Sequence, residues 1–89
     1  MTTKLMRIDN DVNGNPRYVC HFLELLSESD KDSCRGNDMG DVSRMYALAL
    51  KKSRYMGGKK YHNKRYGGGI VFQTYNVQGL EHWIDNLKK

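Results

Sequence analysis

Apolar and polar residues alternate at the start of the chain, which is the pattern of paired β-strands. Strands are predicted at Lys4–Asp9 and Arg17–Leu25, the second of them rich in aromatic and β-branched residues. Between them stands Asn13-Gly14, a strong local signal for a tight hairpin turn. If these two residues form the turn, Ile8 faces Val19 across the hairpin.

The two faces of this predicted hairpin differ in character, and in the same register Met6 faces His21. One face is the expected core face and carries Met6, Ile8, Val19, Leu23 and Leu25. The other face mixes apolar and polar residues, so it is either half covered or a contact in a homodimer. Its apolar members are Leu5, Tyr18, Cys20 and Phe22.

A helical period replaces the alternation in the middle of the chain. From Asp41 to about Met56 the apolar residues recur three and four positions apart, at Val42, Met45, Tyr46, Ala49 and Leu50. Asp41 or Ser43 is the expected N-cap, and Gly57 is suited to the C′ position that ends a helix. Residues 27–40, which are polar and carry both signs of charge, are predicted to be a loop.

The last third of the chain predicts a further strand and helix. Ile70–Tyr75 consists almost entirely of β-favouring residues, and Asn76 then caps a helix with the buried stripe Leu80, Trp83, Ile84 and Leu87. Residues 59–66 fit either a loop or a basic strand that turns at His62-Asn63. The order β-β-α-(β)-β-α predicts one α+β domain over residues 1–89, with an antiparallel sheet of three to four strands and two helices on one face.

Charge adds a functional signal to this fold, because the positive charge is concentrated in one segment. The chain has 15 basic and 10 acidic residues, a net charge of +5. Seven of the basic residues and none of the acidic ones lie between Lys51 and Gly69, so the rest of the chain has a net charge of −2. Tyrosines and a histidine stand among these cations, and glycines border an arm at about residues 57–69.

Such a segment indicates a surface for an anionic partner. Lysine and arginine neutralise phosphates and tyrosine stacks on unpaired bases, so one predicted partner is nucleic acid, either DNA or RNA. The alternatives are an acidic surface of a host protein complex, where tyrosine and arginine are frequent anchors, and a solvated loop without a partner. The candidate binding residues are Lys51, Lys52, Arg54, Lys59, Lys60, Tyr61, His62, Lys64, Arg65 and Tyr66.

The glycines at 67–69 do not form a phosphate-binding loop. Such a loop follows a strand and opens a helix, whereas these glycines precede a strand. They are expected at a bulge, at a close approach of the backbone, or as a hinge of the basic arm. His62 has no evident catalytic partner, and the chain contains no motif of a hydrolase or nuclease. We therefore expect a protein without enzymatic activity and without a cofactor.

A metal site is not predicted either. The aspartates at 30, 32 and 41 have the spacing of a calcium-binding loop, but Arg35 occupies the position that needs glycine. Cys20 and His21 point to opposite faces of a strand, so they cannot share a zinc ion. The two cysteines form no Cys-x-x-Cys motif, and reduced thiols are expected. The longest uncharged apolar run, Met45–Leu50, is too short to span a bilayer, so a cytoplasmic protein is expected.

Two stretches of the sequence resemble small accessory proteins of phages and other mobile elements. They are Asn10–Phe22, with its Asn-Gly-Asn-Pro-Arg-Tyr centre, and Tyr66–Asn76, with its three glycines before an apolar run. Small phage proteins of this kind often bind a host complex, and some inhibit host defence, as anti-CRISPR proteins do. The resemblance implies an accessory protein that engages nucleic acid in the host cytoplasm, or alternatively an inhibitor that docks on a host complex. Because the chain is basic, it does not fit the acidic DNA mimicry of many such inhibitors.

Overall fold

The computed structural model describes residues 4–36, 40–62 and 67–88, and within them it has an α+β fold as predicted. Its strands form one antiparallel sheet in the order β1-β2-β4-β3. The elements are β1 (Met6–Asn10), β2 (Pro16–His21), the 3₁₀ helix η1 (Phe22–Leu25), α1 (Glu28–Cys34), α2 (Asp41–Ser53), the 3₁₀ helix η2 (Arg54–Met56), β3 (Lys59–Lys60), β4 (Gly69–Gln73) and α3 (Val77–Leu87).

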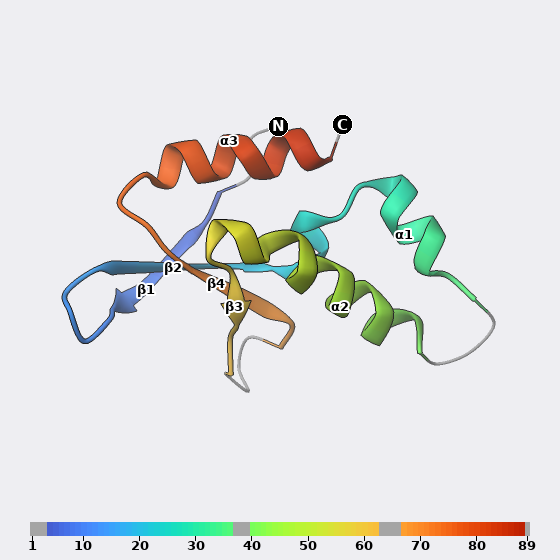
Figure 1. Ribbon diagram of the computed structural model, residues 1–89, viewed down its shortest axis with the longest axis horizontal. Coiled ribbons are helices and arrows are strands. Elements are labelled where there is room, and N and C mark those ends of the chain that lie inside the picture. The colour runs from blue at the N-terminus through green and yellow to red at the C-terminus, as the bar shows by residue number, and fades with distance from the viewer. Residues whose placement is uncertain (1–3, 37–39, 63–66, 89) are drawn as a thin grey trace.

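The hydrophobic core lies between one face of the sheet and the two longer helices, α2 and α3 (Figure 1). Cys20 on β2 pairs with Ile70 on β4, and Phe72 lies on the same face two residues further along β4. These three side chains pack in one cluster with Ala49 of α2 and with residues of α3 and η1. The prediction of two helices on one face of the sheet is therefore confirmed.

The hairpin is present, but the predicted turn and register are wrong. Met6 pairs with Val19 rather than with His21, and the register shifts between Arg7 and Asp9. The turn spans residues 11–15 because the Asp11 carboxylate accepts hydrogen bonds from the backbone N–H groups of residues 13 and 15, both at 2.9 Å. A carboxylate that holds two amides fixes a longer loop than a two-residue turn provides.

The predicted core face of the hairpin is also wrong. Met6 is 49% exposed and Leu23 is 37% exposed, whereas Cys20 and Phe22, which were assigned to the mixed face, are buried in the core. Val19 is buried as predicted. The reason is that both faces of β2 carry apolar residues, so alternation could not show which face the helices cover. Cys20 and Phe22 are consequently unavailable for contact with a second copy of the chain.

Strand β2 is shorter than predicted, and the polar loop that was expected after η1 contains a helix. The backbone N–H of Leu23 donates to His21 Nδ1 at 3.3 Å, and the chain turns there into η1. Ser27 and Asp30 then form a capping box at the start of α1, each side chain accepting the other residue's N–H at 3.1 Å. Helix α1 packs on α2, and its last residue, Cys34, is buried.

Helix α2 begins at Asp41 as predicted, but neither Asp41 nor Ser43 caps it. Gly40 occupies the N-cap position, and because glycine has no side chain, the helix has no side-chain capping hydrogen bond there. The α-helix ends at Ser53, earlier than predicted, and the 3₁₀ helix η2 continues it to Met56. Gly57 ends η2 in a left-handed conformation with φ of 81°, so its predicted role as the terminating glycine is confirmed. The chain then turns directly into β3.

The C-terminal helix agrees closely with the prediction. Asn76 is its N-cap and accepts a hydrogen bond from the N–H of Gly79 at 3.0 Å. Leu80 and Ile84 are buried, and Trp83 packs against the core from a partly buried position. Strand β4 ends at Gln73, two residues earlier than predicted. None of the helices that the structure describes is long and apolar enough to cross a membrane.

Candidate functional site

The described part of the basic segment is distributed over three elements. Lys51 and Lys52 lie in the last turn of α2, Arg54 lies in η2, and Lys59 and Lys60 form β3. Four of these five residues are exposed, and Lys52 is partly buried. The segment thus begins on the helical layer and passes to the edge of the sheet.

At Lys59 the chain enters β3, which is an edge strand of the sheet. Lys59 pairs with Val71 and Lys60 with Ile70, and the N–H of Tyr61 donates to the carbonyl of Gly69 at 3.1 Å. Of the two structures that the sequence allowed here, the strand is the one present at 59–60. Three further candidates, Lys64, Arg65 and Tyr66, lie outside the described residues.

Most basic side chains outside this segment are bound to carboxylates. These ion pairs join Arg17 to Asp9 at 2.6 Å, Lys31 to Glu28 at 3.3 Å, Arg35 to Asp32 at 2.7 Å, Arg44 to Asp41 at 2.9 Å, and Lys88 to Glu24. Within the segment, Lys52 is bound to Asp30 of α1. No ion pair is made in the described part of the chain by Lys51, Arg54, Lys59 or Lys60.

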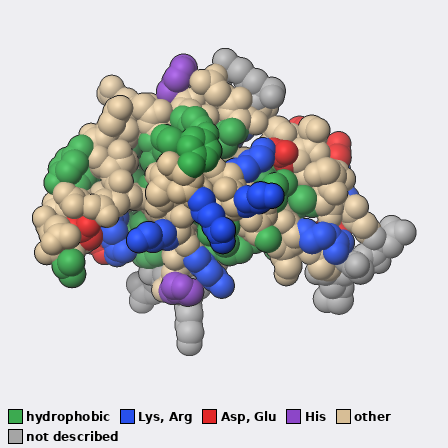
Figure 2. Space-filling view, in the orientation of Figure 1, with side chains coloured by type: hydrophobic (Ala, Val, Ile, Leu, Met, Phe, Trp, Pro, Cys, Tyr) green, Lys and Arg blue, Asp and Glu red, His purple; other side chains and the backbone are tan. Residues whose placement is uncertain are grey.

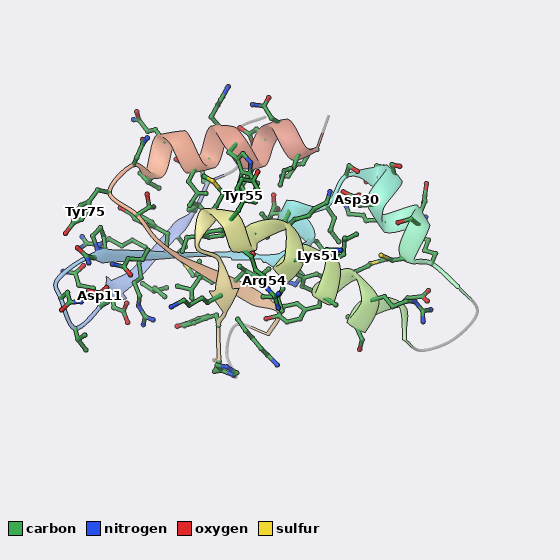
Figure 3. The ribbon with its side chains drawn as sticks, viewed as in Figure 1. Asp11, Asp30, Lys51, Arg54, Tyr55 and Tyr75 are labelled. Atoms are coloured by element: carbon green, nitrogen blue, oxygen red, sulfur yellow. The ribbon has the colours of Figure 1, made fainter. Side chains whose placement is uncertain are left out.

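Two of the unpaired cations, Lys51 and Arg54, lie on a face of the molecule that is rich in basic side chains (Figures 2 and 3). Figure 2 shows lysine and arginine side chains across the middle of one face, whereas aspartate and glutamate appear only towards its edges. Lys51 and Arg54, labelled in Figure 3, lie in this central region at the end of α2. This face therefore has a local excess of positive charge that ion pairs within the described residues do not neutralise.

An exposed aromatic pair adjoins these cations. Tyr55 is 72% exposed, and its ring meets the ring of Trp83 edge-to-face at 5.2 Å between centroids. The indole N–H of Trp83 donates to the Tyr55 hydroxyl, which holds the tyrosine ring in place. Tyr55 follows Lys51 by four residues, the spacing that places two side chains on one side of a helix. That spacing was visible in the sequence, yet Tyr55 was not among the predicted site residues.

A second feature is a cavity of about 830 Å³ between η1, the start of α2 and the end of β3. It is lined by three of the predicted residues, Lys60, Tyr61 and His62, and by seven others: His21, Phe22, Val42, Ser43, Tyr46, Gly67 and Gly68. Of these seven, only the two glycines had been singled out in the sequence; the others come from segments far apart in the chain and were not predicted. None of the described residues that line the cavity is acidic.

Aromatic rings form much of the wall of this cavity. The ring of Phe22 lies 4.5 Å from that of His21 and 5.2 Å from that of Tyr46, measured between centroids. The Nζ atom of Lys60 lies 5.8 Å from the centroid of the Tyr46 ring, at a cation–π distance. Burial raises the pKa of Tyr46, and its hydroxyl donates to the carbonyl of Gly69 at 3.0 Å. Tyr46 is thus fixed by a hydrogen bond to β4.

Metal and thiol chemistry find no support in the part of the chain that the structure describes. No three histidine, cysteine or carboxylate side chains come together there in a group that could hold a metal ion. Both cysteines are free and buried, and burial raises the pKa of Cys20 to about 12. The Cys20 thiol is therefore protonated at neutral pH and is a poor nucleophile.

Comparison with known proteins identifies the family of the chain. The whole sequence, residues 1–89, matches the family described as Staphylococcus phage terminal repeat-encoded protein TreK, and the chain belongs to this family. No curated protein and no solved structure matches it. The phage context that the sequence resemblance implied is thereby confirmed.

Proposed function

We propose that this member of the TreK family of Staphylococcus phage proteins is a non-enzymatic accessory protein that binds nucleic acid. The observation that carries the proposal is the set of four cations that have no acidic partner among the described residues: Lys51, Arg54, Lys59 and Lys60. A cation that is already bound to a carboxylate must break that pair before it can bind phosphate. Unpaired cations on an exposed surface bind phosphate without this cost.

The exposed aromatic pair supports nucleic acid over a simple inorganic anion. The face of an exposed tyrosine is a platform for a nucleobase, and stacking contributes about 1–3 kcal/mol per base. Tyr55 offers such a ring next to Arg54, and its bond to Trp83 reduces the entropy lost on stacking. Phosphate contacts would then fix the strand, and the tyrosine would contact a base without reading its identity.

The four cations set the expected strength and salt dependence of binding. Each phosphate neutralised on a single strand adds about −0.7 to the slope of log K against log salt, so four contacts give a slope of about −3. Affinity would then fall on the order of 50-fold between 50 and 200 mM salt. This is a moderate, electrostatically driven interaction.

Fluorescence anisotropy with labelled single-stranded and duplex DNA and RNA, measured over a range of salt concentrations, tests the proposal. The test variant combines Lys51→Gln with Arg54→Gln, and we expect its slope to be smaller by about 1.4, two contacts' worth. The matched control combines Lys31→Gln with Arg35→Gln, which removes the same charge from two residues that are bound to carboxylates on α1. The control should keep nearly the full slope.

Two results would contradict the proposal. If neither DNA nor RNA binds at low salt, the surface has another purpose. If the test and control variants lose affinity equally, net charge governs binding and the assignment to this surface is wrong.

A second candidate function is an inhibitor that docks on an acidic surface of a host protein complex. The observation that favours it is Tyr55 beside Arg54, since tyrosine and arginine are common energetic anchors of protein interfaces. A pull-down from nuclease-treated host lysate tests it. The inhibitor function requires a stoichiometric protein partner that wild type retains and Tyr55→Ala loses. Absence of such a partner would exclude it.

A further inference from the structure

The cavity beside β3 has the size and walls of a ligand site. Its volume of about 830 Å³ lies within the 300–1,000 Å³ that is usual for small-molecule sites. Its apolar surface is largely aromatic, with the Phe22 ring between those of His21 and Tyr46. Aromatic walls favour a flat aromatic ligand, which can stack or meet them edge-to-face.

The backbone at Gly68 forms one side of the cavity, and the site depends on its being glycine. Its φ of 77° is left-handed, and a Cβ atom at this position would lie 2.7 Å from the Phe22 ring and 3.2 Å from Nε2 of His21. The N–H of Phe22 also donates to the carbonyl of Gly68 at 2.9 Å. The chain therefore packs directly on the rings and fixes their positions.

His21 places an imidazole ring in the wall of the cavity. Its Nδ1 accepts the N–H of Leu23 at 3.3 Å, so in the neutral imidazole the proton is on Nε2. The Nε2 atom is the side of the ring that lies against Gly68, which lines the cavity. A donor in an aromatic site suits the carbonyl oxygens and ring nitrogens at the edge of a nucleobase.

Positive charge adjoins the aromatic wall. Lys60 lies over the Tyr46 ring without an ion pair in the described part of the chain, and the exposed His62 lines the same cavity. A ligand that satisfies the whole site has an aromatic heterocycle for the rings, an acceptor for His21 and a negative group for Lys60.

We propose that this cavity binds one unpaired nucleobase together with its phosphate. The inference rests on the proposed nucleic-acid function and deepens it, because it adds a base-binding site to a surface that otherwise contacts phosphates. The ligand chemistry has two sources: a nucleotide within a single strand, or a free mononucleotide. Duplex DNA does not fit the site unless a base leaves the stack.

The first experiment compares a short single-stranded oligonucleotide with an abasic oligonucleotide of the same length and charge. We expect the intact strand to bind about tenfold tighter, since one stacked base contributes about 1–3 kcal/mol. Ser43 is exposed and lines the cavity, so Ser43→Trp should fill it and reduce this preference to the share that stacking on Tyr55 contributes. The salt slope of the variant should fall by no more than one contact, the one at Lys60, or about 0.7. Ser33→Trp, on the exposed side of α1, is the matched control and should keep the preference.

The second experiment uses adenosine monophosphate as the probe, with NMR signals of His21 and Tyr46 as the readout. A shift of both signals that Ser43→Trp removes supports binding of a free mononucleotide. A preference for the intact strand that Ser43→Trp lowers, without such shifts, assigns the cavity to a nucleotide within a strand. Equal binding of intact and abasic strands, with no response to the mononucleotide, overturns the inference that the cavity binds a base. The proposal that the basic surface binds phosphate is not contradicted by that result. If no oligonucleotide binds but the mononucleotide does, the proposed nucleic-acid function is wrong, whereas the assignment of the cavity as a nucleotide site is supported.

Discussion

Three glycines that border the basic segment allow the same substitution to be made in three different environments. Gly57 has a φ of 81° and no atom within 4 Å of the position where a Cβ would stand. Gly67 likewise has no atom of the described residues within 4 Å of that position, and it has no positive φ. Gly68 has a φ of 77° and the ring of Phe22 only 2.7 Å from that position. Alanine at each site therefore separates backbone strain from steric overlap.

The expected costs follow from these environments. Left-handed backbone costs a non-glycine residue about 1–2 kcal/mol, so Gly57→Ala should destabilise the fold by that amount. Gly68→Ala adds overpacking against Phe22, which typically costs 1–3 kcal/mol, for a total of about 2–5 kcal/mol. Gly67→Ala should instead stabilise the fold by about 0.4–1 kcal/mol, because it restricts the unfolded chain without strain.

Urea unfolding followed by the fluorescence of Trp83 measures all three variants. With a slope near 1 kcal/mol/M, typical of the smallest domains, the midpoint should fall by about 1–2 M for Gly57→Ala. Gly68→Ala should lower the midpoint by about 2–5 M, a large share of the stability of about 5–15 kcal/mol that a domain has. If all three variants unfold at the midpoint of the wild type, these glycines serve as hinges and the structural reasoning is wrong.

Three further predictions concern α1 and the core. Ser27→Ala removes one half of the capping box and should cost about 1 kcal/mol in urea unfolding, and an unchanged midpoint would contradict the role of the cap. Although burial acts to raise the pKa of Asp30, hydrogen bonds from Lys52 and Ser27 outweigh it and lower this pKa below 3.8. The unfolded chain therefore binds the proton more readily, so stability should be lost as the pH falls below about 4, and Asp30→Asn should flatten this part of the pH profile. With its pKa near 12, Cys20 should resist iodoacetamide at pH 8 until the protein is unfolded, as mass spectrometry of labelled peptides would show, and rapid labelling of the native protein would refute its burial.

The order of the strands and of the two longer helices was predictable because each of these elements has a local signal. Asn76 and Gly57 fixed the boundaries of two helices through capping chemistry that depends on neighbouring residues alone. Helix α1 was missed although its Ser27 and Asp30 have capping-box spacing, since its short polar sequence has no apolar period. The register of the hairpin was missed because it depends on hydrogen bonds that the Asp11 carboxylate makes in the folded turn.

The candidate site was only partly predictable for a different reason. A charge count locates the cations, but it cannot show which of them are paired. Lys52 has the same charge as Lys51, yet its contact with Asp30 depends on the packing of α1 on α2. The cavity was not predictable at all, because His21 and Tyr46 come together only through the tertiary fold.

The position of β3 also restricts what can bind to the basic surface. Successive strand residues point to opposite faces of a sheet, so Lys60 lies over Tyr46 on the helical side while Lys59 points to the other side. A partner that contacts both must bend around the edge of the sheet. Duplex DNA resists this, since its persistence length is about 50 nm, whereas a single strand is flexible. The same single strand can place an unpaired base in the cavity, so we expect single-stranded probes to bind more tightly than duplex probes.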